Sequence, residues 1–159
     1  MVESNEIGKV TGRVLIEHLR NGQVIETRLG PNLIVDAGKA GIASRINGAG
    51  SEAAFTYIGI GAGTTAAAAG DTALEAEKAE DGTPTTTHKA ATCTRVTTTV
   101  TNDTAQNVAT FTFTGSVAVT ESGVFNAASA GTLLARQVFS VINVASGDSL
   151  QVTWKIKAA

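Results

Sequence analysis

The sequence predicts a mainly β protein: an antiparallel β-sandwich with one short helix. Three observations favour this fold in the 159-residue chain. Short segments of alternating apolar and polar residues follow one another, without the strand–helix alternation of parallel sheets. Turn sequences such as Asn21-Gly22 and Ser146–Asp148 separate these segments, and threonine and valine are abundant in them. We expect about eight strands in two packed sheets, with jelly-roll-like connections as one variant.

The first expected element is a β-hairpin over residues 10–29. Val14 and Ile16 alternate with their neighbours, and the Asn21-Gly22 dipeptide suits the type I′ turn that joins two hairpin strands. The residues before this segment are polar. We therefore divide the chain into a polar N-terminal arm, residues 1–9, and a single sandwich domain, residues 10–159.

The next segment changes its period from two to that of a helix. Asp36 is the expected N-cap and Gly48 the expected stop. Gly38 and Gly41 each disfavour a helix by about 1 kcal/mol relative to alanine. They are tolerated if the helix packs closely on a sheet.

The remaining strands are predicted from shorter patterns. "AFTYIGIG" forms one strand, a threonine- and valine-rich strand begins at Thr92, and "NVATFTFTGSV" turns its phenylalanines to the core. A further strand, "VAVTESGVFNAA", is interrupted by a bulge at Glu121–Gly123. In the last strand one apolar face contains Leu150, Val152, Trp154 and Ile156. We expect Trp154 in the core rather than stacked on a sugar.

The stretch "YIGIGAGTTAAAAGDTALEAE" resembles a nucleotide-binding loop, but its glycines are spaced G-x-G-x-G and no uninterrupted helix follows. A dinucleotide or phosphate loop needs a helix N-terminus, or a lysine, at that place. We expect a strand exit instead, in which glycine permits unusual backbone dihedrals. Asp71 or Thr72 is expected to cap a short helical turn, with Glu75 completing a capping box.

The residues with catalytic or metal-binding chemistry are few and scattered. Glu75, Glu77, Glu80 and Asp81 lack the glycine-centred spacing of a calcium loop, so we interpret them as a solvated acidic face. His18 and His88 are isolated, and no G-x-S-x-G nucleophile elbow is present. We therefore expect no enzyme, no catalytic or metal-binding residues and no cofactor. The single cysteine, Cys93, excludes an internal disulfide and is expected to be a small buried hydrophobe.

Composition and charge narrow the functional classes further. The formal net charge is -2 and no Lys/Arg cluster occurs in the sequence, so the electrostatic signature of a nucleic-acid-binding protein is missing. No apolar run approaches the ~20 residues that span a bilayer, and the N-terminus has no apolar signal segment. Aromatic residues make up only 4% of the chain. We expect a protein made in the cytosol, with a thin core and part of its stabilisation from neighbours in an assembly.

Several blocks of the sequence resemble a family of small structural proteins of tailed bacteriophages. They occur in "NLIVDAGKAGIASRING", in "FTYIGIGAGTTAAAAGDTALEAE" and in "VTESGVFNAASAGTLLARQVFSVINVASGDSLQVTWKI". The matching positions are Asn32–Gly38, Ile58–Thr64, Asp71–Glu75, Thr120–Asn126 and Gly147–Trp154. The resemblance covers most of the chain from about Asn32 onward and brings no catalytic residues with it.

The resemblance implies a non-enzymatic structural protein of the virion. The first expectation is a capsid decoration (cement) protein that binds and stabilises the lattice of the major capsid protein, on the capsid exterior, after synthesis in the host cytoplasm. The alternative is a tail, baseplate or tail-fibre component that binds a host surface glycan, although the scarcity of aromatic residues argues against it. The expected partners are the major capsid protein and further copies of this chain, with a homotrimer preferred to a dimer. Neither nucleic acid nor membrane is an expected partner.

Overall fold

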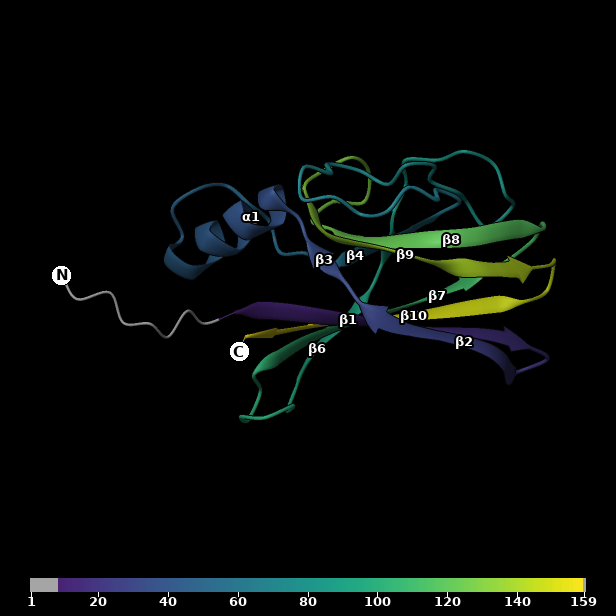
Figure 1. Cartoon of the computed structure of the whole chain (residues 1–159), viewed down its shortest axis with the longest axis horizontal. Helices are drawn as coiled ribbons and strands as arrows, with labels where there is room; N and C mark the ends of the chain where they lie inside the picture. The colour runs from purple at the N-terminus through teal and green to yellow at the C-terminus, as the bar shows by residue number, and fades with distance from the viewer. Residues whose placement is uncertain (1–8, 159) are drawn as a thin grey trace.

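A computed structural model describes residues 9–158 as two antiparallel five-stranded sheets with one helix, which confirms the predicted sandwich (Figure 1). The predicted N-terminal arm, except for Lys9, lies outside the described residues. The elements are β1 (Val10–Arg20), β2 (Gln23–Pro31), β3 (Leu33–Ile34), α1 (Asp36–Asn47), β4 (Tyr57–Gly61), β5 (Lys89–Ala90), β6 (Thr92–Val96), β7 (Thr104–Thr112), β8 (Val117–Phe125), β9 (Leu133–Val144) and β10 (Ser149–Ala158). The expected strands are present, and the short β3 and β5 add to them.

The strand order places the two ends of the domain side by side. Sheet A has the order β2-β1-β10-β7-β6, and sheet B has the order β3-β9-β8-β4-β5. Pairs β1–β2, β6–β7 and β8–β9 are neighbours in sequence, whereas β10 lies between β1 and β7. A long connection over residues 62–88, which we call the crossover, joins β4 to β5.

The core lies between the inner faces of the two sheets. Strand alternation predicts its residues well, because Val14 and Ile16 of β1 and Leu150 and Val152 of β10 are all buried. Trp154 is 1% exposed, as predicted, and its indole Nε1 donates a hydrogen bond of 3.1 Å to Ser122 Oγ on the facing sheet. The polar end of the tryptophan is thus satisfied inside the core.

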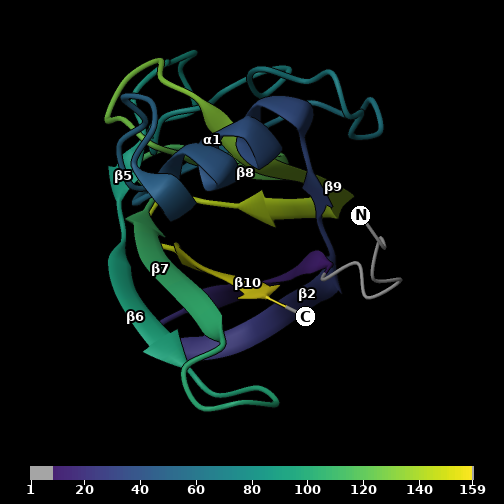
Figure 2. The ribbon, with the colours of Figure 1, turned by 90° about the vertical axis from the view of Figure 1, so that its left-hand side faces the viewer.

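The outer faces of the two sheets differ. The crossover and α1 lie over sheet B, as Figure 1 shows above β8 and β9. A second, smaller apolar cluster lies between this covering layer and sheet B, and consists of Val35, Leu74, Phe125 and Leu133. Within residues 9–158, no element lies over the outer face of sheet A, which is the lower sheet in Figure 2. The domain is therefore a three-layer arrangement with one uncovered sheet face.

The first hairpin has the predicted turn. Asn21 and Gly22 both have positive φ, 53° and 75°, as a type I′ turn requires. The strands β1 and β2 pair across this turn, and one register shift falls between His18 and Leu19.

The helix α1 ends as predicted but begins differently. Gly48 adopts the left-handed conformation, with φ of 70°, and closes the helix. The N-cap is Val35 rather than Asp36, because the Lys39 amide donates the first helical hydrogen bond to the Val35 carbonyl. Asp36 is instead the first helical residue, and its carboxylate accepts a hydrogen bond from the Lys39 ammonium at 2.8 Å.

The glycines of α1 are explained by close packing, as predicted. A Cβ on Gly38 would lie 2.1 Å from the carbonyl oxygen of Leu134, and one on Gly41 would lie 2.5 Å from the Phe55 ring. Any side chain at these two positions would push α1 away from the sandwich. Close contact with β9 and with the segment before β4 thus offsets the low helix propensity of glycine.

Candidate interaction surface

The glycine stretch after β4 binds a carboxylate of the chain itself. Glu121 on β8 is fully buried, and its Oε1 accepts hydrogen bonds from the amides of Gly63 and Ala76 at 3.0 and 2.8 Å. Its Oε2 accepts from the Glu75 amide at 3.1 Å and from Arg136 Nε at 2.9 Å. The amides that would cradle a phosphate in a nucleotide-binding loop are therefore occupied from within.

Arg136 on β9 extends this network into the crossover. Its Nη1 donates to Asp71 Oδ2 at 2.8 Å, and its Nη2 donates to the carbonyl of Thr65 at 3.1 Å. Burial alone would lower the pKa of Arg136, but the Asp71 and Glu121 carboxylates raise it above its usual value. For Asp71, burial opposes ionisation, but the Ala68 amide and Arg136 hold its pKa below the usual range. The predicted helical turn after Asp71 is not formed, because these contacts hold the segment irregular.

The glycines of this stretch are required by space rather than by dihedral angle. Gly59, Gly61 and Gly63 do not have positive φ, so the prediction of unusual dihedrals is wrong. A Cβ on Gly61 would lie 2.4 Å from Glu121 Oε1, and one on Gly63 would lie 2.5 Å from the same atom. The glycines let the backbone approach a buried carboxylate.

His88 has a similar structural role at the end of the crossover. Its Nδ1 donates to the carbonyl of Ala127 at 2.8 Å, its Nε2 lies 3.4 Å from Glu77 Oε1, and its ring stacks on Phe125 with centroids 3.7 Å apart. Burial alone would lower the pKa of His88, but the Glu77 carboxylate and the Ala127 carbonyl raise it above the ordinary value. Both ring nitrogens thus face acceptors, which favours the imidazolium form.

His18 lies in a histidine–aspartate pair that sequence reasoning missed. Its Nε2 donates to Asp148 Oδ2 at 2.8 Å, and Arg20 donates two hydrogen bonds to the same carboxylate. The hydrogen bonds from Arg20 lower the pKa of Asp148, and burial of the carboxylate raises it. The hydrogen bonds dominate, so the pKa of Asp148 is well below its usual range. Among residues 9–158, no hydroxyl or thiol is hydrogen-bonded to the His18 ring. The pair ties β1 to the turn before β10 and presents no nucleophile.

The four carboxylates of the predicted acidic face are held by separate partners rather than gathered around one point. Glu75 accepts hydrogen bonds from Thr65, Asp81 accepts from Thr83, Glu77 lies beside His88, and Glu80 accepts from Lys89. Across the residues that the structure describes, no three His, Cys, Asp or Glu side chains are placed to hold a metal ion. The four side chains therefore act in local contacts of the crossover.

Cys93 is exposed on β6, so the prediction of a small buried hydrophobe is wrong. β6 is an edge strand of sheet A and has little cover on either face. The thiol lines a hollow of about 670 Å³ between α1 and β6, beside Phe55 and the 81%-exposed Ile46. Partial burial raises the pKa of the thiol, which lowers its reactivity at neutral pH.

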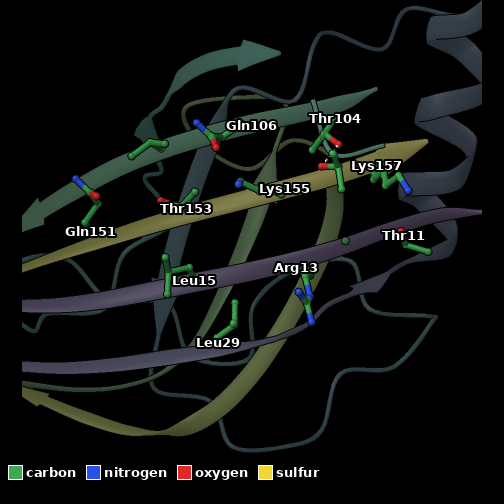
Figure 3. A pocket seen from close by; sticks show the side chains of 13 residues that line it. Thr11, Arg13, Leu15, Leu29, Thr104, Gln106, Gln151, Thr153, Lys155 and Lys157 are labelled. Atoms are coloured by element: carbon green, nitrogen blue, oxygen red, sulfur yellow. Dashed lines mark hydrogen bonds between the residues drawn. The ribbon is translucent and has the colours of Figure 1, made fainter. Parts of the chain in front are cut away.

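The uncovered face of sheet A is a second surface that these internal contacts leave free, beside the hollow between α1 and β6. Side chains of four strands point outward there, around a shallow hollow of about 550 Å³ (Figure 3). We call this surface the outer face of sheet A, and its hollow is lined by Thr11, Gly12, Arg13, Leu15, Leu29, Thr98, Thr104, Gln106, Val108, Gln151, Thr153, Lys155 and Lys157.

The outer face of sheet A combines an apolar row with a basic end. Register places Leu29, Leu15, Thr153 and Val108 in one row across β2, β1, β10 and β7, in which Thr153 is the one polar residue. One step along the strands, Arg13 of β1 lies directly opposite Lys155 of β10, and Lys157 follows two residues later. Figure 3 shows these three basic side chains around the hollow, on β1 and β10.

Acidic partners for this basic end are missing from the described part of the chain. No ion pair joins Arg13, Lys155 or Lys157 to a carboxylate of residues 9–158, although Lys157 donates a hydrogen bond to Thr99. The nearby Asp103 accepts the amides of its own turn, which hold its pKa well below the usual range despite partial desolvation. Like charges directly opposite each other destabilise a sheet.

Comparisons with protein-family models, with curated proteins and with solved structures found no match. In the described residues, no helix has the length and apolar character needed to cross a membrane.

Proposed function

We propose that this chain is a structural protein of a tailed-phage virion and acts as a decoration protein on the capsid exterior. The proposal takes its family from the sequence blocks that run from Asn32 to Trp154. Its role would be to bind the lattice of the major capsid protein and to reinforce the shell against disruption.

One contrast supports the proposal: the buried polar groups are used in contacts within the chain, whereas one face of sheet A is uncovered. Glu121, Arg136, His18 and His88, the buried groups with catalytic chemistry, all make internal contacts that tie strands to loops. The principal exposed hollows instead lie over sheet A and beside α1, where strands and helix form a broad surface. Such a molecule suits binding to another protein better than chemistry on a small substrate.

The expected assembly is a homo-oligomer on a symmetric lattice, a trimer in the first place and a dimer in the second. Several weak contacts to a repeating lattice give strong attachment through avidity, so no single contact needs to be tight. The mass of the purified protein, from size-exclusion chromatography with light scattering, tests this expectation.

The direct test uses capsids of the parent phage that lack this protein. Purified protein should bind them at a fixed ratio per capsid subunit and raise the temperature at which they disrupt. Wild-type virions should contain hundreds of copies, detected as gold label over the whole head. Absence of binding to bare capsids would overturn the decoration role, and label at the tail tip with a few copies per particle would support the glycan-binding tail component instead.

A further inference from the structure

We propose that the outer face of sheet A is the docking surface, and that it binds an acidic, partly apolar patch of a protein. This inference deepens the proposed function, on which it rests, because the protein that carries the patch is then the major capsid protein. We infer the kind of binding partner from three properties of the face: its charge, its apolar row and its size.

The charge of the face specifies an acidic partner. Arg13 and Lys155 are exposed and lie directly opposite each other on β1 and β10. Such a like-charge pair costs stability in the isolated domain. A carboxylate placed over both side chains would turn this repulsion into two attractive contacts. One carboxylate, Glu17, lies on the same face further along β1, opposite Gln151, and forms no ion pair with either cation. Both cations are thus available to an anion of a partner.

The apolar row distinguishes a protein partner from a nucleic acid. Leu29 is 64% exposed and continues through Leu15 to Val108 beside the basic end. An apolar centre with charges at its rim is typical of protein–protein interfaces. Nucleic acids are held mainly by many phosphate contacts, commonly about 6–10 of them, and Arg13, Lys155 and Lys157 are too few for that mode.

The size of the face agrees with docking through several copies. The four longer strands of sheet A, β2, β1, β10 and β7, are about 4.8 Å apart and about 30 Å long, and offer roughly 600 Å² of surface. Stable protein interfaces bury about 800 Å² on each partner. One face therefore gives a contact slightly below the standard size, which repeated copies on a lattice would strengthen.

The opposite side of the domain is less suited to this role. Sheet B is covered by the crossover, in which Asp71, Glu77 and Glu80 are held by Arg136, His88 and Lys89, respectively. A partner would reach the outer face of sheet B only by displacing the crossover, which would expose the buried Glu121 and Arg136.

The test compares two double charge reversals in capsid binding. Arg13→Glu with Lys155→Glu alters the outer face of sheet A. Lys39→Glu with Arg45→Glu alters α1 and changes the net charge of the protein by the same amount. We expect binding of the first variant to bare capsids to weaken by at least about 30-fold, as when one partner of a buried interfacial charge pair is lost. The second variant should bind as the wild type does.

Each other outcome has a definite meaning. If the wild type and the α1 variant bind and the sheet A variant binds equally well, the docking surface is wrong and the decoration role stands. Equal loss in both variants would indicate a net-charge effect and overturn the surface. Failure of the wild type to bind capsids would overturn the decoration role, and the capsid docking with it.

Nucleic acid is the remaining alternative, and it has its own measurement. The wild type is titrated with random-sequence duplex DNA at the salt concentration used for capsids, and we expect no binding. Tight DNA binding that the sheet A reversal abolishes would overturn the inference in favour of a nucleic-acid surface. Circular dichroism melts of both variants are the control: a melting transition like that of the wild type would exclude unfolding as the cause of lost binding.

Discussion

The outer faces of the two sheets show two uses of polar residues in one small domain. Over sheet B, Glu121 and Arg136 are buried and joined to the crossover by hydrogen bonds from backbone and side chains. Over sheet A, Arg13 and Lys155 face each other, and neither forms an ion pair with a carboxylate of residues 9–158. The first arrangement stabilises the fold, whereas the second costs stability. The comparison teaches that charges unfavourable to the isolated domain indicate where a partner is expected.

The largest effect is expected from Glu121→Ala. The substitution leaves the Gly63, Glu75 and Ala76 amides without their acceptor and removes one carboxylate from the buried Arg136. We expect the free energy of unfolding to fall by about 3–5 kcal/mol in urea titrations. The control is Glu17→Ala, with a change within about 0.5 kcal/mol, because Glu17 alternates with Arg13 and Leu15 on the outer side of β1 and its side chain has no hydrogen bond or ion pair in the described residues. Equal changes in the free energy of unfolding of the two variants would contradict the proposed difference between the faces.

The next effect is expected from Gly61→Ala in the same network. The new methyl group would lie 2.4 Å from Glu121 Oε1 and 2.7 Å from the Ala76 carbonyl. Overpacking of this kind destabilises by about 1–3 kcal/mol. Gly70→Ala is the matched control, because a Cβ there meets no atom within 4 Å and Gly70 does not have a positive φ. The melting temperatures of the two variants are compared with that of the wild type. An equal decrease in Gly70→Ala and Gly61→Ala would contradict the steric explanation.

A smaller, pH-dependent effect is expected from His88. Its pKa is raised in the folded state, so the proton is held more tightly there than in the unfolded chain. The stabilisation is fully present below the unfolded pKa of about 6.5 and is lost as pH rises through the folded pKa.

The midpoint of thermal unfolding should therefore fall between pH 6 and pH 9 more in the wild type than in His88→Gln. Each 1 kcal/mol corresponds to about 2–4 °C in a domain of this size. A parallel pH dependence in the two proteins would show that His88 does not hold its proton through Glu77 and Ala127.

The smallest effect is expected from Arg13→Glu alone. The substitution replaces repulsion with attraction opposite Lys155, so the domain should become more stable by about 0.2–1 kcal/mol at low salt. The gain should shrink at 1 M salt, where the Debye length is about 3 Å. A loss of stability at low salt would mean that Arg13 already has a favourable partner, and the contrast between the faces would fail.

Local patterns were enough to predict much of the fold. Alternation placed Leu150, Val152 and Trp154 on the inner face of β10, and the Asn21-Gly22 turn fixed the first hairpin. Gly48 was predictable because a helix stop needs a residue that tolerates positive φ. These features depend on residues close together in the sequence.

Features that depend on distant residues were not predictable. Glu121 and Gly63 are 58 positions apart, and His18 and Asp148 are 130 apart, so no spacing rule connects them. The outer face of sheet A needs β1 and β10 to be neighbours, which only the strand order reveals. Cys93 was misjudged because alternation gives a face but does not show that β6 is an uncovered edge strand. A sequence pattern identifies a strand or a helix, but the strand order decides which distant residue each polar group contacts.

Lysine footprinting on assembled capsids tests the central claim most directly. The side chains are acetylated in free protein and in protein bound to capsids, and the reaction at each lysine is measured by mass spectrometry. We predict that Lys155 and Lys157 become protected on the capsid, while Lys39, whose side chain is 62% exposed on α1, reacts as it does in solution. Protection of Lys39 with unchanged reaction at Lys155 and Lys157 would contradict docking through the outer face of sheet A.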